Sequence, residues 1–490
     1  MEAPRTLGVV GAGTMGAGIA QLGAGAGMRT LLHDPIPEAL DSGVERARGG
    51  LRKWAERGRE VDQSLLETAT SLGELSGCEL VIEAAPERLE LKRELFGLMS
   101  EALPDAVLAT NTSSIPVTAL ASAAAKPDRV VGMHFFNPAP LMKLVEVIAA
   151  DQTGEHALGV ARATGEAMGK RVIDAADGPG FLVNRCGRPF YTEALRLLQE
   201  RLATHEQIDR ICRMGGGFRM GPFELMDLVG IDVGFEVAQS FTELSFGEPR
   251  WKPNPIQARM VAAGRLGRKT GRGYYDYSEE PYRPEDPEPP EPGGGEGRGL
   301  ALRGDGALGD LLRERAVSAG FDLNGTDPWL TVDASTEERD GHADLVLCTS
   351  RGLAGRDAPV GFHALPPLGS LVELTGEQRP EVEELFGALG FVTEWVGDGP
   401  GLVLGRIVCQ LANEAAFAIG EGVGSAEDVD AGVTLGLNHP RGPVEWGREL
   451  GPEHVLAVID GLYEERHEER YRAAPLLRRA ARLGEWPPPT

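Results

Sequence analysis

The sequence of 490 residues predicts an α/β domain with a mostly parallel sheet, then an all-α domain, then a degenerate second copy that ends in another all-α domain. Three observations predict this. Short apolar runs alternate with helical stretches from Arg5 to about Ala150. Beyond Gly180 the apolar residues recur at helical spacing. Finally, residues of the first half recur in the second half at a constant offset of 221 positions. The DGPG motif shows this offset, because it begins at residue 177 and again at residue 398, and 398 minus 177 is 221.

The first domain, which we place at 1–182, carries a series of short apolar runs that read as strands. In chain order they are TLGVVGAG, LLHDP, CELVIEAAP, AVLATNTSS, RVVGMHFF and KLVEVI. Strands that are apolar throughout, separated by helices, are typical of a parallel sheet covered on both faces. The first domain is therefore expected to be a doubly covered α/β sheet.

The second domain, at 183–278, is expected to be all-α. It opens with FLVNRCGRPFYTEALRLLQE, in which apolar residues recur at the spacing of a helix. The segment 279–298 follows, and it is so dense in Pro, Glu and Gly that it cannot form a core. We interpret it as a solvated linker between two halves.

The second half repeats the first in part. Asp177-Gly178-Pro179-Gly180 recurs as Asp398-Gly399-Pro400-Gly401, and the helical domain of 177–270 returns as 398–490. The same register matches Arg185 to Arg406, Glu193 to Glu414, Asp209 to Asp430, Gly221 to Gly442, Pro222 to Pro443 and Gly230 to Gly451. Upstream, PVGFHALPPLGSLVEL resembles VVGMHFFNPAPLMKLVEV, so 299–397 is expected to be a degenerate partial α/β region without a glycine fingerprint of its own.

Composition excludes several classes of protein. With 49 Lys and Arg against 74 Asp and Glu, the net charge of −25 repels polyphosphate, so nucleic-acid binding is not expected. No apolar run is long enough to span a membrane, and MEAPRTLGVV does not have the pattern of a secretory signal. The five cysteines lie far apart without a CxxC pair, which predicts a cytoplasmic protein with neither disulfides nor a metal site.

A glycine motif follows the first predicted strand and opens an apparent helix. It comprises Gly11, Gly13, Thr14, Met15 and Gly16. Such glycines permit a tight turn and the close approach of a pyrophosphate to a helix N-terminus. Asp34 ends the next strand, about twenty residues on, where a carboxylate accepts hydrogen bonds from a ribose and repels a 2′-phosphate. The pattern favours NAD over NADP; the alternative is a plain glycine turn with an incidental aspartate.

His134 and Glu146 form a second candidate group. His134 ends the strand RVVGMHFF, and Glu146 lies in the strand KLVEVI that follows it. If the two strands are neighbours, the carboxylate can fix the tautomer of the imidazole and stabilise its protonated form, which makes a general base. A histidine near an apolar run can equally be a satisfied core residue. Asn184, Ser113 and Asn111 are similarly ambiguous, as structural anchors or loop residues.

In combination, these motifs resemble the L-3-hydroxyacyl-CoA dehydrogenase family along nearly the whole chain. The motifs are GVVGAGTMGAGIAQ, TNTSSIPVTALA, GMHFFNPAPLMKLVEVI, DGPGFLVNRCGRPFYTEAL, GGGFRMGPFELMDLVGID and GRLGRKTGRGYYDY. The tail, RGPVEWGRELG followed by EERYRAAPLLRRAA, looks like that of the double-length bacterial members associated with phenylacetate degradation. Those act on 3-hydroxyadipyl-CoA or 3-hydroxybutyryl-CoA.

The resemblance implies a Rossmann-type NAD-binding domain and roles for individual residues. His134 matches the catalytic base and Glu146 its partner, while Ser113 and Asn184 match residues that contact the reacting oxygens of the substrate. The further positions implied to contact the nucleotide are Asp34, Glu87, Lys92, Ser113, Asn137 and Lys269. The implied reaction is NAD-dependent oxidation of a 3-hydroxyacyl-CoA in fatty acid metabolism, β-oxidation or phenylacetate degradation.

The segment 43–59 carries six basic residues against two acidic ones, in a chain that is acidic overall. Guanidinium groups suit phosphates, so we expect Arg52, Lys53 and Arg57, together with Ser113, to bind coenzyme A. A solvated helix face is the alternative. The family often has a Ser where this chain has Gly50, and a Lys where it has Arg57.

Two other functions remain open at this stage. One is an NAD-dependent dehydrogenase of a free hydroxy acid, of the gulonate type, and the other is an inactive NAD-binding structural protein. For the second helical domain we expect a structural role, because Gly405 occupies the position of Asn184. An internal pseudo-dimer of the two helical domains, with possible further homo-oligomerisation, would follow from the two-fold dimers of single-length members.

Overall fold

The computed structural model describes residues 1–336, 341–354 and 356–487, which form two compact units. The first unit is Met1–Arg185 together with Gly422–Leu437. The second unit is Cys186–Glu421 together with the residues from Asn438 onward. Each unit is described by itself below.

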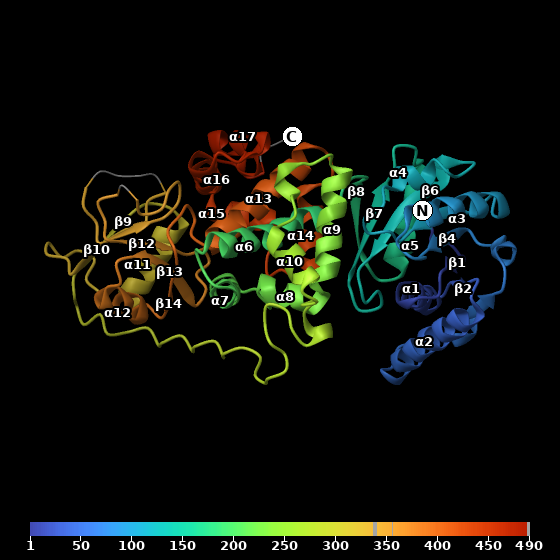
Figure 1. Ribbon diagram of the computed structural model, residues 1–490, viewed down its shortest axis with the longest axis horizontal. Coiled ribbons are helices and arrows are strands. Elements are labelled where there is room, and N and C mark those ends of the chain that lie inside the picture. The colour runs from blue at the N-terminus through green and yellow to red at the C-terminus, as the bar shows by residue number, and fades with distance from the viewer. Residues whose placement is uncertain (337–340, 355, 488–490) are drawn as a thin grey trace. The chain divides into compact units, whose positions relative to one another are not determined.

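The first unit contains an eight-stranded sheet in the order β3-β2-β1-β4-β5-β6-β7-β8 (Figure 1). Its strands are β1 (Thr6–Val10), β2 (Arg29–His33), β3 (Leu66–Ala69), β4 (Leu80–Glu83), β5 (Val107–Thr110), β6 (Val130–Phe135), β7 (Leu144–Ala149) and β8 (Arg171–Ala176). All neighbours are parallel except β6 and β7, which are antiparallel. The predicted α/β domain with a mostly parallel sheet is confirmed.

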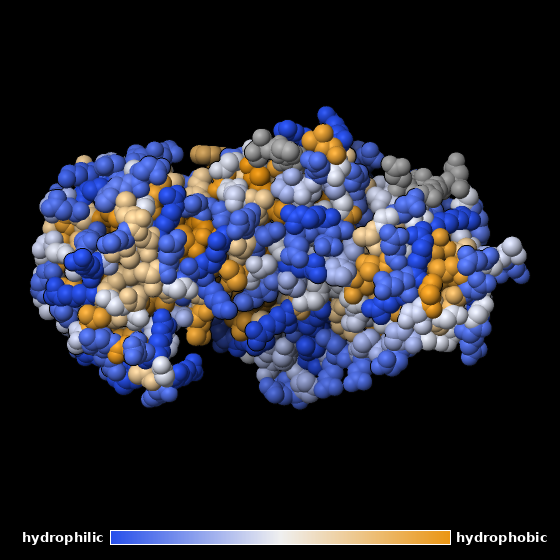
Figure 2. Space-filling view, turned by 180° about the vertical axis from the view of Figure 1, so that it is seen from behind, coloured by the Kyte–Doolittle hydropathy of each residue, from blue (hydrophilic) through white to orange (hydrophobic). Residues whose placement is uncertain are grey.

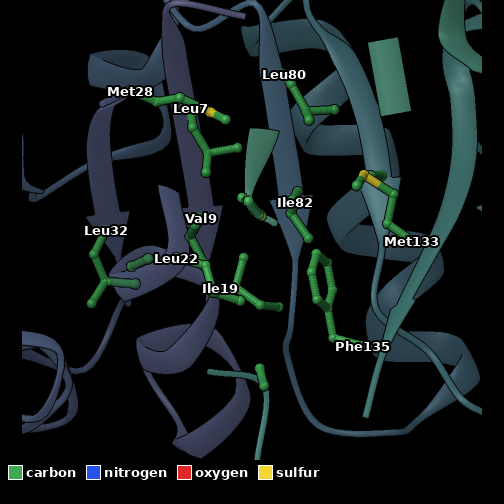
Figure 3. Packing of buried hydrophobic residues seen from close by; sticks show 14 of the residues in the cluster. Leu7, Val9, Ile19, Leu22, Met28, Leu32, Leu80, Ile82, Met133 and Phe135 are labelled. Atoms are coloured by element: carbon green, nitrogen blue, oxygen red, sulfur yellow. The ribbon is translucent and has the colours of Figure 1, made fainter. Parts of the chain in front are cut away.

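Helices separate these strands, as the alternating pattern predicts. They are α1 (Thr14–Gly25), α2 (Pro37–Glu56), α3 (Leu89–Ala102), α4 (Val117–Ala121) and α5 (Glu155–Ala167), with short 3-10 turns η1 (Gln63–Leu65), η2 (Leu72–Leu75) and η3 (Pro127–Arg129). Figure 3 shows Val9 of β1 close to Ile19 and Leu22 of α1, and Leu7 of β1 belongs to the same cluster. These side chains are almost completely buried, so the apolar faces of strand and helix form one core.

One helix of the first unit comes from the far end of the chain. Helix α14 (Ala426–Leu437) packs against β7 and β8. Arg171 Nη2 lies 2.6 Å from Glu427 Oε1, and Ala176 N donates to Val423 O at 2.8 Å. The second half of the chain therefore covers part of the first sheet.

The second unit includes the predicted all-α domain. Helix α6 (Val183–Glu200) begins in the first unit, and α7 (His205–Gly216), α8 (Pro222–Val229), α9 (Ile231–Leu244), α10 (Pro255–Ala262), η4 (Pro249–Trp251) and η5 (Arg268–Thr270) follow. The ends of α7 are set by local sequence. Thr204 and Gln207 form a capping box, and Gly217 takes the left-handed conformation with φ of 72°.

The linker segment 279–298 contains neither helix nor strand and runs as an extended trace (Figure 1). It is nevertheless attached to the helical domain. Tyr282 Oη and Arg283 Nε both donate to Glu224 Oε1, and Asp286 accepts two hydrogen bonds from Arg213. Ion pairs thus hold the acidic segment along the helices it follows.

A six-stranded sheet follows, in the order β14-β13-β12-β11-β10-β9. Its strands are β9 (Leu300–Arg303), β10 (Leu330–Asp333), β11 (Leu345–Leu347), β12 (Val360–His363), β13 (Leu371–Gly376) and β14 (Val392–Trp395), with helices α11 (Ala307–Ser318) and α12 (Pro380–Ala388). Again one neighbouring pair is antiparallel, β12 with β13. His363 stands opposite Glu373 there, as His134 stands opposite Glu146 between β6 and β7.

The expectation that the second half lacks a glycine fingerprint is wrong. Gly304, Gly306 and Gly309 have the same spacing as Gly11, Gly13 and Gly16, and they connect β9 to α11. Gly304 has φ of 102° and Gly11 has φ of 103°. The backbone between strand and helix therefore turns at both sites through a conformation that glycine favours.

The remaining helices are α13 (Leu404–Gly420), α15 (Pro443–Leu450), α16 (Pro452–Arg466), η6 (Glu469–Tyr471) and α17 (Pro475–Leu483). Every residue of α13 from Leu404 to Ala418 is buried. Its apolar side chains share one core with those of α6, and Arg406 of α13 binds Glu193 of α6 at 2.8 Å.

Hydrophilic side chains cover most of the face shown in Figure 2, with apolar residues in separate patches between them. Within the described ranges, no helix combines the length and apolar composition needed to cross a bilayer.

Candidate active site

The glycine loop between β1 and α1 leaves room for a ligand. A Cβ on Gly11 would lie 2.7 Å from Ala84 O, and one on Gly16 would lie 1.7 Å from Gly11 O, so both positions exclude a side chain. Around Gly13 a Cβ would meet nothing within 4 Å, which is the open side of the loop. Helix α1 begins at once with no side-chain cap and no acidic residue in its first turn. Its free N–H groups suit a phosphate.

Asp34 is tied to the same loop. Its Oδ2 accepts a hydrogen bond from Ala12 N at 2.8 Å, and its Oδ1 accepts one from Ile36 N at 3.0 Å. The carboxylate is only partly buried at the end of β2. It is therefore held next to the glycine loop with acceptor capacity left for the hydroxyls of a ribose.

His134 and Glu146 are directly opposite one another on β6 and β7. His134 Nδ1 lies 2.6 Å from Glu146 Oε2, and both side chains are buried. The other oxygen, Oε1, accepts hydrogen bonds from the backbone N–H groups of Leu182 and Val183 at 3.1 and 3.0 Å. The start of α6 thus fixes the carboxylate, the carboxylate fixes the imidazole, and Nε2 is the ring nitrogen left for a ligand.

A cavity of about 340 Å³ brings these residues together. Its lining includes three of the predicted catalytic side chains, His134, Ser113 and Asn184, together with Asn137, which was predicted to contact the nucleotide. Met15 of the glycine motif, Glu87, Asn111, Ala84, Ala85, Phe135 and Phe136 complete it. The ring of Phe136 lies 4.5 Å from that of His134, centroid to centroid.

Glu87 organises the loop that carries Ser113. Its Oε1 accepts hydrogen bonds from Thr112 Oγ1 at 2.6 Å, Ser113 N at 2.9 Å and Ser114 Oγ at 3.0 Å. Burial tends to raise the pKa of Glu87, but the charge of Lys92 and these hydrogen bonds lower that pKa below its ordinary value. Glu87 is therefore a carboxylate at neutral pH and positions the serine beside the cavity.

Two predicted nucleotide-binding lysines lie elsewhere than in the cavity lining. Lys92 is buried, and its Nζ lies 2.7 Å from Glu83 Oε1 and 3.4 Å from Glu87 Oε2. Lys269 belongs to the second unit, where its Nζ lies 2.6 Å from Asp232. Lys92 therefore pairs with Glu87, which lines the cavity, and with the buried Glu83.

The predicted coenzyme A residues lie on an exposed face of α2 or directly after it. Arg52, Lys53 and Arg57 are all exposed, and Arg52 Nη2 pairs with Glu45 Oε1 at 2.6 Å. Arg59 lies over the ring of Trp54, 4.3 Å from its centroid. The face of α2 that packs on α1 explains why residue 50 is a glycine, because a Cβ at this position would lie 2.0 Å from Gln21 Oε1 of α1. A serine at position 50 would have to displace Gln21.

Sequence reasoning missed Glu83 and Phe136. Glu83 is completely buried and accepts hydrogen bonds from Lys92 Nζ, Thr110 Oγ1 and Ala85 N. A charged residue at the carboxyl end of an apolar strand, as in CELVIEAAP, was the signal that could have revealed it. Phe136 carried no signal, because an aromatic after a strand is ordinary core composition.

The observed loop fits a dinucleotide: a glycine turn open at Gly13, an uncapped helix N-terminus and a fixed carboxylate at Asp34. Comparison with known proteins agrees. Residues 6–178 match the family model of the 3-hydroxyacyl-CoA dehydrogenase NAD binding domain. The model of the C-terminal domain of the same family matches twice, at 180–277 and 401–488.

Individual relatives cover the whole chain or its first half. The chain is 36% identical to the 3-hydroxyadipyl-CoA dehydrogenase of Escherichia coli (strain K12), over 98% of both chains. A crystal structure of 3-hydroxybutyryl-CoA dehydrogenase from Escherichia coli K12 superposes with a TM-score of 0.83 at 34% identity, covering 98% of this chain and 99% of that one. The 3-hydroxybutyryl-CoA dehydrogenase of Mycobacterium tuberculosis is 40% identical and covers 56% of this chain with 99% of its own length. On this evidence the chain binds NAD and belongs to the 3-hydroxyacyl-CoA dehydrogenase family.

Proposed function

We propose that the protein oxidises a (S)-3-hydroxyacyl-CoA to the 3-oxoacyl-CoA with NAD, the acyl group being 3-hydroxyadipyl or 3-hydroxybutyryl. The observation that carries the proposal is the buried His134–Glu146 pair beside the glycine loop, in one cavity with Ser113 and Asn184. Full-length and half-length relatives named for these two substrates support it.

In the proposed mechanism His134 removes the proton of the C3 hydroxyl through Nε2. Glu146 accepts the Nδ1 proton in a hydrogen bond and stabilises the imidazolium that forms. Ser113 and Asn184, which line the same cavity, orient the hydroxyl and donate to the developing carbonyl oxygen. NAD supplies the acceptor for the hydride that leaves C3.

The proposed binding residues form two groups, one for the dinucleotide and one for coenzyme A. Gly11, Gly13, Thr14, Met15, Gly16 and Asp34 would hold the dinucleotide, with Glu87, Lys92, Asn137 and Lys269 as further nucleotide-side residues. The exposed basic face with Arg52, Lys53 and Arg57 would bind the phosphates of coenzyme A. All five cysteines are free and buried, which supports a reducing, cytoplasmic location.

We further propose that residues 299–490 are a degenerate copy of 1–278, joined by the linker 279–298, and that the two helical domains, 183–278 and 398–490, form an internal pseudo-dimer. The antiparallel strand pairs with their opposed His and Glu support the copy. The glycine turns support it too: a Cβ on Gly304 would meet Ala334 and Ser335, and one on Gly11 meets Ala84 and Ala85. Within the part of the chain that the structure describes, the copy lacks counterparts of β2 and α2, since β10 directly follows α11 and pairs with β9.

A reciprocal exchange of helices supports the pseudo-dimer. Helix α14 packs on β7 and β8 in the first unit, and within the second unit α7, its match in the 221 register, packs on β13. A Cβ on Gly436 of α14 would lie 2.9 Å from Leu144 Cδ2 of β7, and one on Gly215 of α7 would lie 3.6 Å from Leu371 O of β13. Each sheet is therefore covered by a helix from the other half, as in a two-fold pair.

The copy has lost the catalytic arrangement at one position. A Cβ on Gly405, the match of Asn184, would lie 2.2 Å from His363 Cε1, so the histidine ring occupies the space of the missing asparagine. His363 Nδ1 makes no hydrogen bond with a described residue, and Nε2 instead lies 3.3 Å from His454 Nε2. Glu373 still accepts from Val403 N and Leu404 N. Glu373 therefore keeps the backbone contacts that Glu146 makes, whereas His363 does not make the contact that His134 makes with its glutamate.

The test is a spectrophotometric assay of NADH formation with 3-hydroxyadipyl-CoA, 3-hydroxybutyryl-CoA and longer 3-hydroxyacyl-CoA esters. The corresponding free hydroxy acids serve as the control. Turnover of a CoA thioester but not of the free acid is expected. Turnover of the free acid alone would indicate a hydroxy-acid dehydrogenase, and no turnover of any would indicate an inactive NAD-binding protein.

A further inference from the structure

The loop between β6 and β7 carries two of the residues that line the cavity, Phe136 and Asn137. The ring of Phe136 is in contact with that of His134, and Asn137 is one of the proposed nucleotide-side residues. After Asn137 the segment 138–143 belongs to neither strand, because β7 begins only at Leu144. The conformation of this loop therefore determines where both side chains stand in the cavity.

Lys170, the residue before β8, binds this loop through its side chain. Its Nζ donates to Ala139 O at 2.7 Å and to Met142 O at 2.6 Å. The lysine is buried, and no carboxylate among the described residues pairs with it. Burial, and to a lesser extent the charge of Arg59, lowers the pKa of Lys170 to about 8, so the group is largely a cation at pH 7. Two backbone carbonyls are thus its hydrogen-bond acceptors.

The backbone around Lys170 is fixed by elements other than the loop. Gly169 ends α5 with φ of 72°, and Lys170 N donates to Gly165 O of that helix at 3.0 Å. Arg171 N then donates to Lys143 O at 2.7 Å, where β8 begins beside β7. The side chain of Lys170 therefore extends from a fixed helix end to a segment that has no strand pairing of its own.

The same loop lies on α1, the helix that follows the glycine turn. A Cβ on Gly18 would lie 3.0 Å from Pro140 Cδ and 3.3 Å from Ala139 Cβ, so loop and helix are in direct contact. A change in the loop would therefore reach both the cavity and the helix of the dinucleotide site.

The second half provides an internal comparison for the lysine. In the 221 register Lys170 corresponds to Phe391, and both follow a glycine with positive φ, 72° at Gly169 and 87° at Gly390. Phe391 is buried in the core of the second sheet. A side chain that only had to fill this position could therefore be apolar, without the free-energy cost of burying a cation.

The loop itself is shorter in the second half. The motif HFFNP corresponds to HALPP, so that Pro366 stands at the position of Asn137. Between this motif and the next strand the first half has 139–143, whereas the second half has only 368–370. The two carbonyls that Lys170 binds belong to the longer segment. The lysine, the longer loop and the asparagine of the cavity therefore occur together in one half, and all three are absent from the other.

We propose that Lys170 is a positioning residue for the reaction, and that its ammonium group holds the loop so that Asn137 meets the nucleotide and Phe136 supports the ring of His134. The inference rests on the proposed function. Lys170 is not among the residues that line the cavity, so it acts through the loop. Its two charge-assisted hydrogen bonds satisfy carbonyls that the sheet leaves unpaired.

The experiment compares Lys170→Met, Lys170→Arg and the intact protein by fluorescence titration with NADH and by turnover of 3-hydroxybutyryl-CoA. Lys170→Met should weaken NADH binding about tenfold, the equivalent of one lost hydrogen bond. It should lower kcat by about 10–10²-fold, because a displacement of about 1 Å near the reacting atoms has that effect. Lys170→Arg keeps a cation that can donate to both carbonyls and should restore most of the NADH affinity and of kcat.

The matched control is Lys143→Met, which removes an exposed lysine at the end of the same loop. It should change neither NADH affinity nor kcat. Thermal unfolding of each variant shows whether it is folded at the temperature of the assay. Lys170→Met should be folded there, because the apolar Phe391 occupies the corresponding position in the second half.

Unchanged NADH affinity and kcat in folded Lys170→Met, losses that Lys170→Arg does not restore, or a Lys170→Met protein that does not fold would overturn the inference and make Lys170 a residue of the fold alone. Failure of the proposed function is distinguishable, since the intact protein would then bind NADH but turn over no CoA ester.

Discussion

His134 owes its orientation to a strand register. Its partner Glu146 stands directly opposite on β7, and two backbone N–H groups at the start of α6 hold that carboxylate. A shift of one residue in the β6–β7 register would turn Glu146 to the other face of the sheet. The general base proposed here therefore depends on strand pairing as much as on the two side chains.

Replacing His134 by Gln or Ala should reduce turnover of a 3-hydroxyacyl-CoA by about 10²–10⁴-fold, the usual contribution of a positioned general base. NADH binding, measured by fluorescence titration, should be nearly unchanged, because the glycine loop does not involve the imidazole. Glu146→Gln should show a milder form of the same defect. Wild-type turnover in the His134 variants would show that another group removes the proton.

Asp34→Ala should weaken the preference for NAD over NADP, because it removes the ribose acceptor and the charge that repels a 2′-phosphate. Since Asp34 also accepts from Ala12 N, Asp34→Asn is a useful second variant, as it keeps an acceptor for that N–H while losing the charge. The measurement is kcat/KM with each cofactor. An intact enzyme that already prefers NADPH would contradict the assignment.

Much of the site could be predicted from sequence, and the omissions have a common cause. His134, Glu146 and Asp34 end or occupy apolar strands, where a polar residue at the carboxyl edge of a sheet points to chemistry. The partners of buried charges could not be recognised, because partners such as Glu193 for Arg406 come from distant segments. Pairing of buried charges is a tertiary property.

At the level of elements, the apolar strands were predicted and the amphipathic edge strands were not. β3 reads LETA and β8 reads RVIDAA, with exposed or half-buried residues between buried ones, so neither gives a continuous apolar run. The second glycine turn was missed because Asp305 stands between Gly304 and Gly306, where the first turn has Ala12. The similarity of the two turns is seen in their backbone conformation, since φ is 102° at Gly304 and 103° at Gly11.

Helix α14 is expected to support the catalytic cavity of the first unit. A Cβ on Gly436 would lie 3.3 Å from Phe136 Cε1 and 2.9 Å from Leu144 Cδ2, and Phe136 lines the cavity beside His134. Gly436→Leu should therefore lower stability by about 1–3 kcal/mol, as overpacking does, and lower kcat by displacing Phe136.

The matched control is Gly387→Leu on α12, where a Cβ would meet nothing within 4 Å. Urea unfolding and steady-state kinetics of both variants provide the comparison. If Gly436→Leu had wild-type kcat and stability, the helix would be no more than a cover for β7 and β8.

For the whole molecule, the second half, which we propose to be a degenerate copy of the first, should be required for a monodisperse protein. Truncation near Glu279 removes α13 from its core with α6, and removes α14 from β7 and β8. The fragment should expose these apolar faces and then dimerise or aggregate. In a two-fold dimer of fragments, α7 of each copy would occupy the place of α14 on the other.

Sedimentation of the fragment and of the intact chain distinguishes the outcomes. A soluble monomeric fragment with full activity would show that the second half covers nothing of importance. Gly405→Asn in the intact chain should give no second active site, since its Cβ alone would collide with the ring of His363.

Because α7 and α14 are separate segments of one chain, their sequences can differ, which the corresponding helices of identical subunits cannot do. In a symmetric dimer one helix sequence must serve both partners, so every substitution enters the complex twice. Here the helix that faces β7 and β8 carries Gly432 where α7 carries Ile211. A Cβ on Gly432 would lie 2.7 Å from Val183 Cγ2, so isoleucine could not stand there without moving Val183. In the proposed pseudo-dimer, fusion would let each of the two related helices adapt to its own sheet, and dilution could not separate the two halves.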